Sequence, residues 1–381
     1  MNSTTIRTCD LEHLLTQLEI QQAQKRDVVV NTASLRYEDG NLIIPGAADA
    51  VLTEDGVTVG DLKAGILDEA ESQIGSRLDI PRRYVRKMRA DSLVSGEPIL
   101  DTTMNYWLAK DPGRALVRSF VDENGEGLCR AVLSDRFRII DHLDTLSAVI
   151  SGIARSATEP GSVTVESADL SDRSMTVRFV APNISLLAPA LLNGYRSPFT
   201  GAYGTDNPVV SAGFVLRNSE TGGGAYTLVP RIRVKVCNNG LIIAKDAMRE
   251  VHIGKKLDEG VIEWSDATRR KQIDLISSQA SDAVATFLSA KWVERTIADL
   301  ERQAGVAVTS PEQTITHVAR TLLYSDDERS ALMDHFIRGG LLTAGGVLHA
   351  VTSMAQVVDD PDRSWEIESD GLRAMALVSN I

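Results

Sequence analysis

The sequence has 381 residues, a formal net charge of −12, 43% hydrophobic residues and 24% charged residues. At roughly 150 residues per domain, this length predicts two or three structural units, and the composition excludes a disordered chain. A protein this acidic gains little from a general attraction to phosphate. A local basic groove is still compatible with the net charge, because exposed charges are largely screened beyond about 8 Å at physiological salt.

The cysteines and the apolar segments predict a cytoplasmic protein without membrane contact. Cys9, Cys129 and Cys237 are far apart in the sequence and form no CxxC pair, so we expect reduced thiols. Residues 1–10 lack the apolar stretch of a signal peptide, and the longest apolar run, Gly339 to Val351, is too short and too rich in glycine to span a bilayer.

The first hundred residues predict helices and short hairpins. An amphipathic helix begins near Leu11, and the Asp-Gly pairs at Asp39 and Asp55 lie between apolar alternations typical of hairpins. A helical period from Asp61 to Gly75 predicts a second helix, and a third begins at Pro81. The third helix carries the densest basic cluster of the chain: Arg82, Arg83, Arg86, Lys87 and Arg89. The last two helices are compatible with a helix-turn-helix reader, with an electrostatic contact surface or with a solvated helix face.

The central part of the chain predicts an antiparallel sheet. Two β-type runs flank Asn124-Gly125, a hairpin signature, and further strands follow around Val163 and Met175. A helix over residues 143–154 is expected to pack against this sheet.

A basic strand follows at residues 230–236, where cationic and apolar residues alternate strictly. Side chains alternate between the two faces of a strand, so Arg231, Arg233 and Lys235 would form a cationic row on one face. Such a row suits a groove that follows an extended phosphate backbone, and it equally suits protection of an exposed sheet edge against pairing.

From Val261 onward the pattern is helical, and sequences of the capping-box type at Ser310 and Ser325 predict further helix starts. The carboxylate-rich stretch from Asp359 to Asp370 is interpreted as solvated. We therefore predict an α+β protein with a central antiparallel sheet, packed helices and a mainly helical C-terminal region. The expected divisions are residues 1–60, a core at 61–260 that contains the basic strand, and a helical region at 261–381.

Motifs for catalysis, cofactors or metals are weak. The sequence contains no GxxxxGK[ST] and no HExxH motif, and we predict no catalytic, cofactor-binding or metal-binding residue. Gly222 to Gly224 fit a flexible hairpin tip better than a phosphate-binding loop. Asp135, Asp141 and Asp144 are candidates for magnesium ligands, but carboxylates beside a strand and at a helix start are commonplace.

One segment resembles a known family. Arg217-Asn218-Ser219-Glu220-Thr221-Gly222, then Val229-Pro230-Arg231 and Val236-Cys237-Asn238-Asn239-Gly240-Leu241, are similar to the core of the phage/plasmid-like family, a domain of unknown function. Weaker similarity covers roughly residues 75 to 355. The resemblance implies a location on phages or plasmids, hence in a bacterial host cell, and it implies no established activity. The basic strand with adjoining helices also resembles, more distantly, the single-strand annealing proteins of phage recombination.

These observations give one leading hypothesis and one alternative. The leading hypothesis is a homo-oligomeric protein that binds single-stranded DNA through Arg231, Arg233 and Lys235, helped by Arg82, Arg83, Arg86 and Lys87, and that promotes annealing. Candidates for base stacking are Tyr106, Trp107, Tyr195, Phe199 and Tyr203. The alternative is a non-enzymatic assembly protein that contacts protein partners through its C-terminal helices. A metal-dependent nuclease is a third, less favoured reading.

Overall fold

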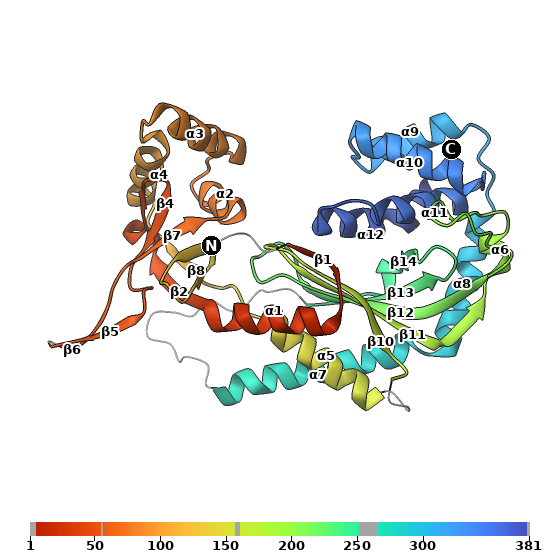
Figure 1. Cartoon of the computed structure of the whole chain (residues 1–381), viewed down its shortest axis with the longest axis horizontal. Coiled ribbons are helices and arrows are strands. Elements are labelled where there is room, and N and C mark those ends of the chain that lie inside the picture. Colours follow the sequence, from red (N-terminus) through yellow and green to blue (C-terminus); the bar gives the residue numbers. More distant parts are fainter. Residues whose placement is uncertain (1–4, 55, 157–160, 251–265, 379–381) are drawn as a thin grey trace.

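The computed structural model describes residues 5–54, 56–156, 161–250 and 266–378. The protein is α+β, and the predicted fold class is confirmed: antiparallel pairing dominates its sheets, and the C-terminal region is helical. Figure 1 shows two lobes side by side, each built around one sheet, with helices α2 and α3 at one end of the molecule and the C-terminal helices at the other.

The N-terminal lobe contains a six-stranded sheet with the order β2-β8-β9-β7-β4-β3. Its strands are β2 (Lys25–Asn31), β3 (Arg36–Glu38), β4 (Asn41–Ile44), β7 (Leu62–Ile66), β8 (Arg114–Val121) and β9 (Gly127–Ser134). Three helices, α2 (Asp68–Arg77), α3 (Arg82–Ser95) and α4 (Ile99–Lys110), contribute to the same apolar core. The sheet includes strands from both sides of residue 60.

The helix predicted from Asp61 to Gly75 is partly wrong. Leu62–Ile66 forms strand β7, which pairs with β4 on one side and in parallel with β9 on the other. Leu62 and Ala64 are buried and two residues apart, a spacing typical of a strand, although the apolar residues of this segment also fit a helical period. Pairing with two neighbouring strands decides in favour of the strand. The helix begins only at Asp68, whereas the helix expected after Pro81 is confirmed as α3.

The second lobe contains a seven-stranded antiparallel sheet, with β15 added beside β13 to the order β1-β10-β11-β12-β13-β14. The strands are β1 (Ile6–Cys9), β10 (Thr164–Leu170), β11 (Met175–Leu187), β12 (Val209–Asn218), β13 (Tyr226–Val234), β14 (Gly240–Ile242) and β15 (Met248–Glu250). The predicted hairpin at Asn124-Gly125 is confirmed as β8–β9. The basic strand predicted at residues 230–236 is confirmed as β13 as far as Val234, and Lys235 lies in the turn that follows.

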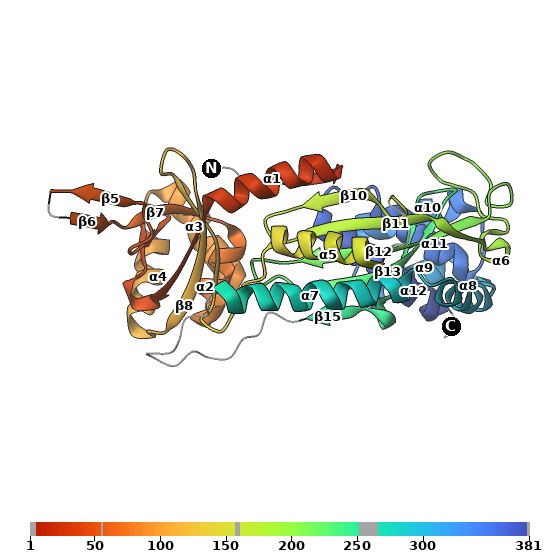
Figure 2. The same cartoon turned by 90° about the horizontal axis from the view of Figure 1, so that it is seen from below.

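One face of this sheet is apolar and is covered along its whole length. At one end, stacked Phe179 and Phe214, with ring centroids 4.7 Å apart, lie in a core with α1 (Leu11–Gln24), α5 (His142–Ser156) and α7 (Asp266–Phe287). At the other end, Ile232 and Val234 belong to the core of the C-terminal helices. Figure 2 shows α1, α5 and α7 running along the sheet.

The C-terminal helices are α8 (Ala290–Ala304), α9 (Pro311–Thr321), α10 (Asp326–Gly339), α11 (Ala344–Ala355) and α12 (Pro361–Val378). A short helix, α6 (Pro189–Leu192), packs among them. The capping box predicted at Ser325 is confirmed at the start of α10. At Ser310 the helix begins as predicted, but the serine side chain makes no capping hydrogen bond.

Candidate functional site

The cationic row predicted on β13 is not an open surface. Arg231 is 3% exposed and forms ion pairs with Glu166 of β10 and Glu368 of α12. Arg233 is half-buried and pairs with the same Glu166. Lys235 alone is exposed. The prediction of a row of three free cations is therefore wrong, because two of them are neutralised inside the protein.

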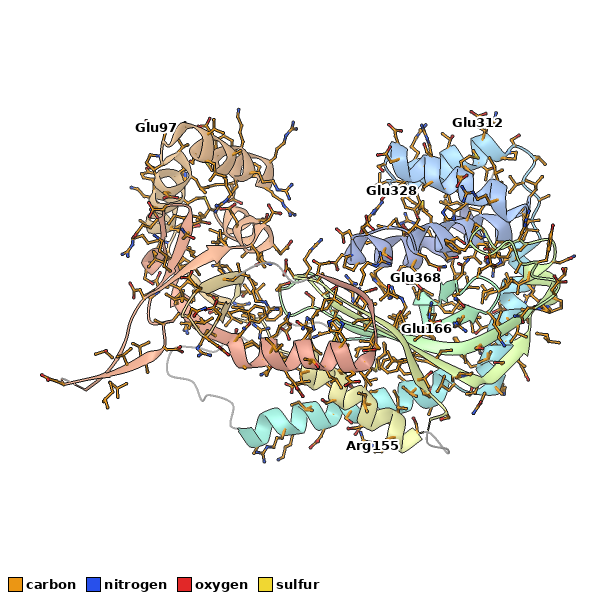
Figure 3. The ribbon with its side chains drawn as sticks, viewed as in Figure 1. Glu97, Arg155, Glu166, Glu312, Glu328 and Glu368 are labelled. Carbon is orange, nitrogen blue, oxygen red and sulfur yellow. The ribbon has the colours of Figure 1, made fainter. Side chains whose placement is uncertain are left out.

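The acidic segment from Asp359 to Asp370 was predicted to be solvated, but one of its carboxylates, Glu368, pairs with the buried Arg231. The segment forms the first half of α12, which lies over the polar face of the seven-stranded sheet, and Figure 3 shows Glu166 and Glu368 between sheet and helix. Glu368 also accepts hydrogen bonds from Arg178 of β11, at 3.1 and 3.2 Å. The acidic pattern was read as solvated because its arginine partners lie more than a hundred residues away in the sequence.

Asp362 anchors the start of α12 on the sheet. Its carboxylate accepts hydrogen bonds from Ser171 at 2.7 Å, Ser174 at 2.6 Å and Arg217 at 2.6 Å. Burial opposes ionisation of Asp362, but these donors outweigh it and lower the pKa of the carboxyl. Burial also opposes ionisation of Glu166, but Arg231 and Arg233 outweigh this effect and hold the pKa of Glu166 below its usual value. Both carboxylates are therefore charged at neutral pH, and α12 is held by charge-assisted bonds.

Glycine at position 240 makes this arrangement possible. A Cβ atom there would collide with the guanidinium of Arg231 and with the carboxylate of Glu368. Asn239, beside it, is fully buried and donates to the carbonyl of His349 at 3.2 Å and to Ser353 at 3.0 Å. Gly240 and Asn239 therefore both have a structural role here.

The Asn218-Ser219-Glu220 segment lies at the junction of the two lobes. Glu220 is 1% exposed, and its carboxylate accepts from Lys25 of β2 at 2.7 Å, from Arg130 of β9 at 3.0 Å and from the backbone amide of His142 at 2.7 Å. Burial raises the pKa of Glu220, but the surrounding positive charges hold it well below its usual range. Glu220 is thus an ionised anchor between the two sheets.

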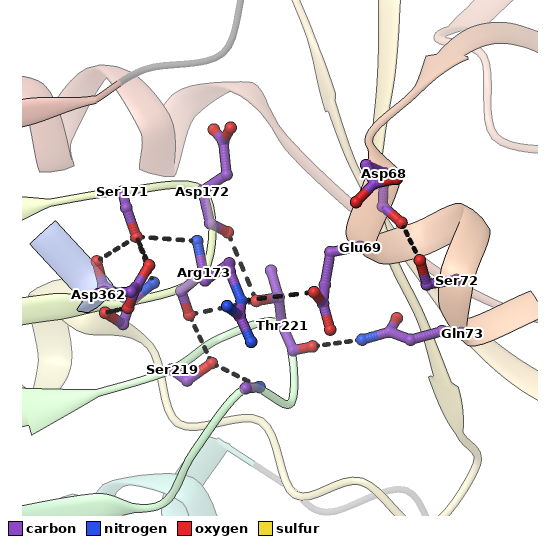
Figure 4. Close-up of polar contacts among 12 residues, drawn as sticks. Asp68, Glu69, Ser72, Gln73, Ser171, Asp172, Arg173, Ser219, Thr221 and Asp362 are labelled. Carbon is purple, nitrogen blue, oxygen red and sulfur yellow. Dashed lines mark hydrogen bonds and ion pairs between the residues drawn. The ribbon is translucent and has the colours of Figure 1, made fainter. Parts of the chain in front are cut away.

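The neighbouring side chains complete this junction. Arg118 is fully buried and donates to Asp27, to Asp141 and to the carbonyl oxygen of Glu220. In Figure 4, Gln73 of α2 donates to the carbonyl of Thr221 at 2.7 Å, and Ser219 donates to the carbonyl of Arg173. The side chains of Arg118, Gln73, Ser219 and Glu220 all have partners within the protein, so the junction fits a structural role. Among the described residues, the buried Oδ1 of Asn218 lacks a hydrogen-bond partner there.

The basic cluster on α3 does lie on the surface. Arg82 and Arg86 share one carboxylate, Asp68, whose pKa their hydrogen bonds lower to about 2. Arg83 and Lys87 are exposed, and within the described residues neither has an ion-pair partner. Of the seven cations predicted to bind nucleic acid, Lys235, Arg83 and Lys87 are therefore free, and Lys235 lies in the other lobe.

The candidate stacking residues are dispersed, and the candidate magnesium ligands form no metal-binding group among the described residues. Tyr195 is buried, whereas Tyr106, Trp107, Phe199 and Tyr203 are exposed, the first two on α4 and the last two in the loop before β12. Among the described residues, no three His, Cys, Asp or Glu side chains are grouped as metal ligands. Asp141, a candidate magnesium ligand, is paired with Arg118 and Lys25.

The sequence patterns did not identify one exposed apolar surface of the N-terminal lobe as a functional candidate. The hairpin predicted at Asp55-Gly56 exists as β5 (Ala50–Thr53) and β6 (Gly56–Val59), but in the described sheets these strands pair only with each other. Figures 1 and 2 show the β5–β6 hairpin projecting away from the rest of the lobe. We call this hairpin the arm.

One face of the arm is apolar. The register pairs Ala50 with Val59 and Leu52 with Val57, so these four exposed side chains share a face. Leu52 is 80% exposed and Val57 71% exposed. The alternation of apolar residues around the turn predicted the hairpin, but it could not show that this face stays exposed among the described residues.

Comparison of the chain with protein-family models, with curated proteins and with solved structures found no match. Within the described part of the chain, no helix is both long and apolar enough to cross a lipid bilayer.

Proposed function

We propose that this protein is a non-enzymatic assembly protein that binds a protein partner through the arm. The observation that carries the proposal is the uncovered apolar face formed by Ala50, Leu52, Val57 and Val59. The resemblance of the segment around Asn218 to the phage/plasmid-like family supports, as part of the proposal, a role in a phage or plasmid.

An isolated two-stranded hairpin is marginally stable in water and needs packing to persist. The base of the arm is fixed to the lobe, because β5 and β6 continue the β4–β7 hairpin and the amide of Ala48 donates to the carbonyl of Gly60 at 3.1 Å. The outer part exposes its apolar face. Exposed apolar groups of this kind mark sites of protein contact.

The charge of the arm favours a protein over a nucleic acid. Between Arg36 and Lys63 the sequence contains no lysine, arginine or histidine, and it contains Asp49, Glu54, Asp55 and Asp61 around the arm. Contact with phosphate requires cations. An acidic, apolar hairpin instead fits an apolar protein surface with basic residues beside it.

A photo-crosslinking amino acid at position 52 tests the proposal. We expect irradiation in cells to give a covalent adduct with a protein, because Leu52 lies at the centre of the apolar face. The same probe at position 323 is the control, since Leu323 is 85% exposed but lies in the other lobe. Absence of any protein adduct at position 52, or equal adducts at both positions, contradicts the proposal.

A second candidate function is single-stranded DNA binding, and one observation favours it. Arg83 and Lys87 are free and exposed on α3, and Tyr84 between them is 52% exposed. Cations beside an exposed aromatic ring suit a backbone contact with base stacking. Arg82 and Arg86 add less charge, because both already pair with Asp68.

Fluorescence anisotropy with a labelled single-stranded oligonucleotide tests this candidate. Binding through α3 predicts that Arg83→Glu with Lys87→Glu abolishes binding, and that milder Lys87→Ala lowers the salt slope by about one. The matched control is Arg329→Glu with Arg338→Glu on α10, which replaces two exposed arginines in the other lobe. Absence of binding at low salt removes this candidate.

A further inference from the structure

We infer that the partner of the arm is a second copy of this chain, and that the arm docks on the outward face of α3 in that copy. This inference rests on the proposed function and adds the identity of the partner and of the receiving surface.

The outward face of α3 is apolar at one end and basic at the other. Arg83, Lys87 and Val94 follow one another along one side of the helix, and Leu93 flanks them. The exposed Asp91 lies on the same side, between the basic and the apolar end. Leu93 is 80% exposed and Val94 90% exposed. Arg83 and Lys87 carry positive charge at one end of this face, and no carboxylate among the described residues pairs with them.

The arm has the complementary pattern. Its stem presents Leu52 and Val57, and its turn carries the exposed Glu54. Leu52 and Glu54 are about 7 Å apart along an extended strand, to which the side chain of Glu54 adds its own reach. Lys87 and Val94 are about 10 Å apart along the helix. The stem can therefore cover Leu93 and Val94 while Glu54 reaches Lys87.

The receiving helix must belong to another molecule. Figures 1 and 2 show the arm pointing away from the lobe, on the side opposite to α3. Each chain carries both surfaces, so each chain can give one arm and receive another. Two chains that exchange arms about a two-fold axis form a closed pair, whereas chains that each pass the arm to a further copy form rings or filaments.

Two variants that each disable one surface test this inference in the full chain. The arm variant is Leu52→Thr with Val57→Thr, since threonine keeps a high strand propensity and removes apolar contact. The receptor variant is Arg83→Glu with Lys87→Glu, since glutamate forms helices well and repels Glu54. Matched controls are Ile337→Thr with Leu342→Thr, and Arg329→Glu with Arg338→Glu, at exposed positions of the second lobe.

Sedimentation velocity is measured for each protein and for an equimolar mixture of the two variants. We expect the wild type and both controls to form species of two or more chains, and each variant alone to sediment at the monomer mass of 41.3 kDa. The mixture should contain a species of two chains and none larger, because one intact arm meets one intact receptor. Unchanged thermal unfolding of the variants confirms that they fold.

A wild type that stays monomeric, an arm variant that assembles like the wild type, or a mixture without the two-chain species overturns the inference. These outcomes are separable from failure of the proposed function. If the probe at position 52 crosslinks a different protein while the wild type remains monomeric, the arm binds a protein other than this chain. If the probe crosslinks nothing, both proposals fall.

Discussion

Arg231 of β13 and Glu368 of α12 form a buried ion pair, with Nε and Oε1 3.3 Å apart and both side chains less than 10% exposed. The pair joins the sheet that was expected to bind nucleic acid to the acidic segment that was expected to be solvated. The two charge patterns of the sequence are therefore partners of each other, and the surface left for external partners lies elsewhere.

Glu166→Gln tests the importance of this buried charge network. The substitution leaves Arg231 and Arg233 without their shared carboxylate, and removal of one partner from a buried pair costs about 3–5 kcal/mol. We expect a loss of this size in the free energy of unfolding, measured by urea denaturation. Asp334→Asn is the control, because its pair with Arg338 is exposed and such pairs contribute about 1 kcal/mol or less. Equal losses in the two variants would show that the network does not stabilise the fold.

Two buried histidines predict a pH dependence of stability. Burial lowers the pKa of His142 and of His349 from 6.5 to about 4. Between these values the unfolded chain binds protons that the folded chain does not, so stability is complete above pH 6.5 and falls as the pH is lowered toward 4.

We expect His349→Gln to flatten this dependence, since glutamine can still donate to the carbonyl of Leu191 but does not titrate. The measurement is the free energy of urea unfolding at several pH values in that window. Parallel curves for the variant and the wild type would refute a contribution from His349.

Position 213 on β12, within the seven-stranded sheet, has no space for a side chain larger than that of glycine. A Cβ atom at this position would collide with the carbonyl oxygen of Phe179 on the neighbouring strand. We expect Gly213→Ala to cost about 1–3 kcal/mol or more in unfolding experiments. Gly305→Ala is the matched control, because open space surrounds Gly305 and its φ of −77° suits alanine. A neutral Gly213→Ala variant would show that the two strands can separate without cost.

Local patterns predicted much of the fold. The hairpins at Asp39, Asp55 and Asn124, the helix after Pro81 and the strand around Arg231 all appear, because turn residues and periodicity specify these elements without distant contacts. The strand at Leu62 was missed, since its identity depends on pairing with β4 and β9.

The candidate site was predicted less well, and the reason is physical. Alternation placed Arg231 and Arg233 on the correct face of β13, but periodicity does not tell whether a polar face meets water or another element. Distant parts of the chain supply the partners of these arginines: Glu166 comes from β10 of the same sheet, and Glu368 from α12 above it. Likewise, the sequence around Leu52 predicts two strands but not the absence of a third element over them.

Amide hydrogen exchange of the arm, measured at low and high protein concentration, tests the account most directly. A free two-stranded hairpin opens readily, whereas docking on another molecule protects its amides. We predict that protection of the arm, residues 50–59, rises with concentration while that of the β3–β4 hairpin stays constant. Protection of the arm that does not depend on concentration would contradict assembly through it.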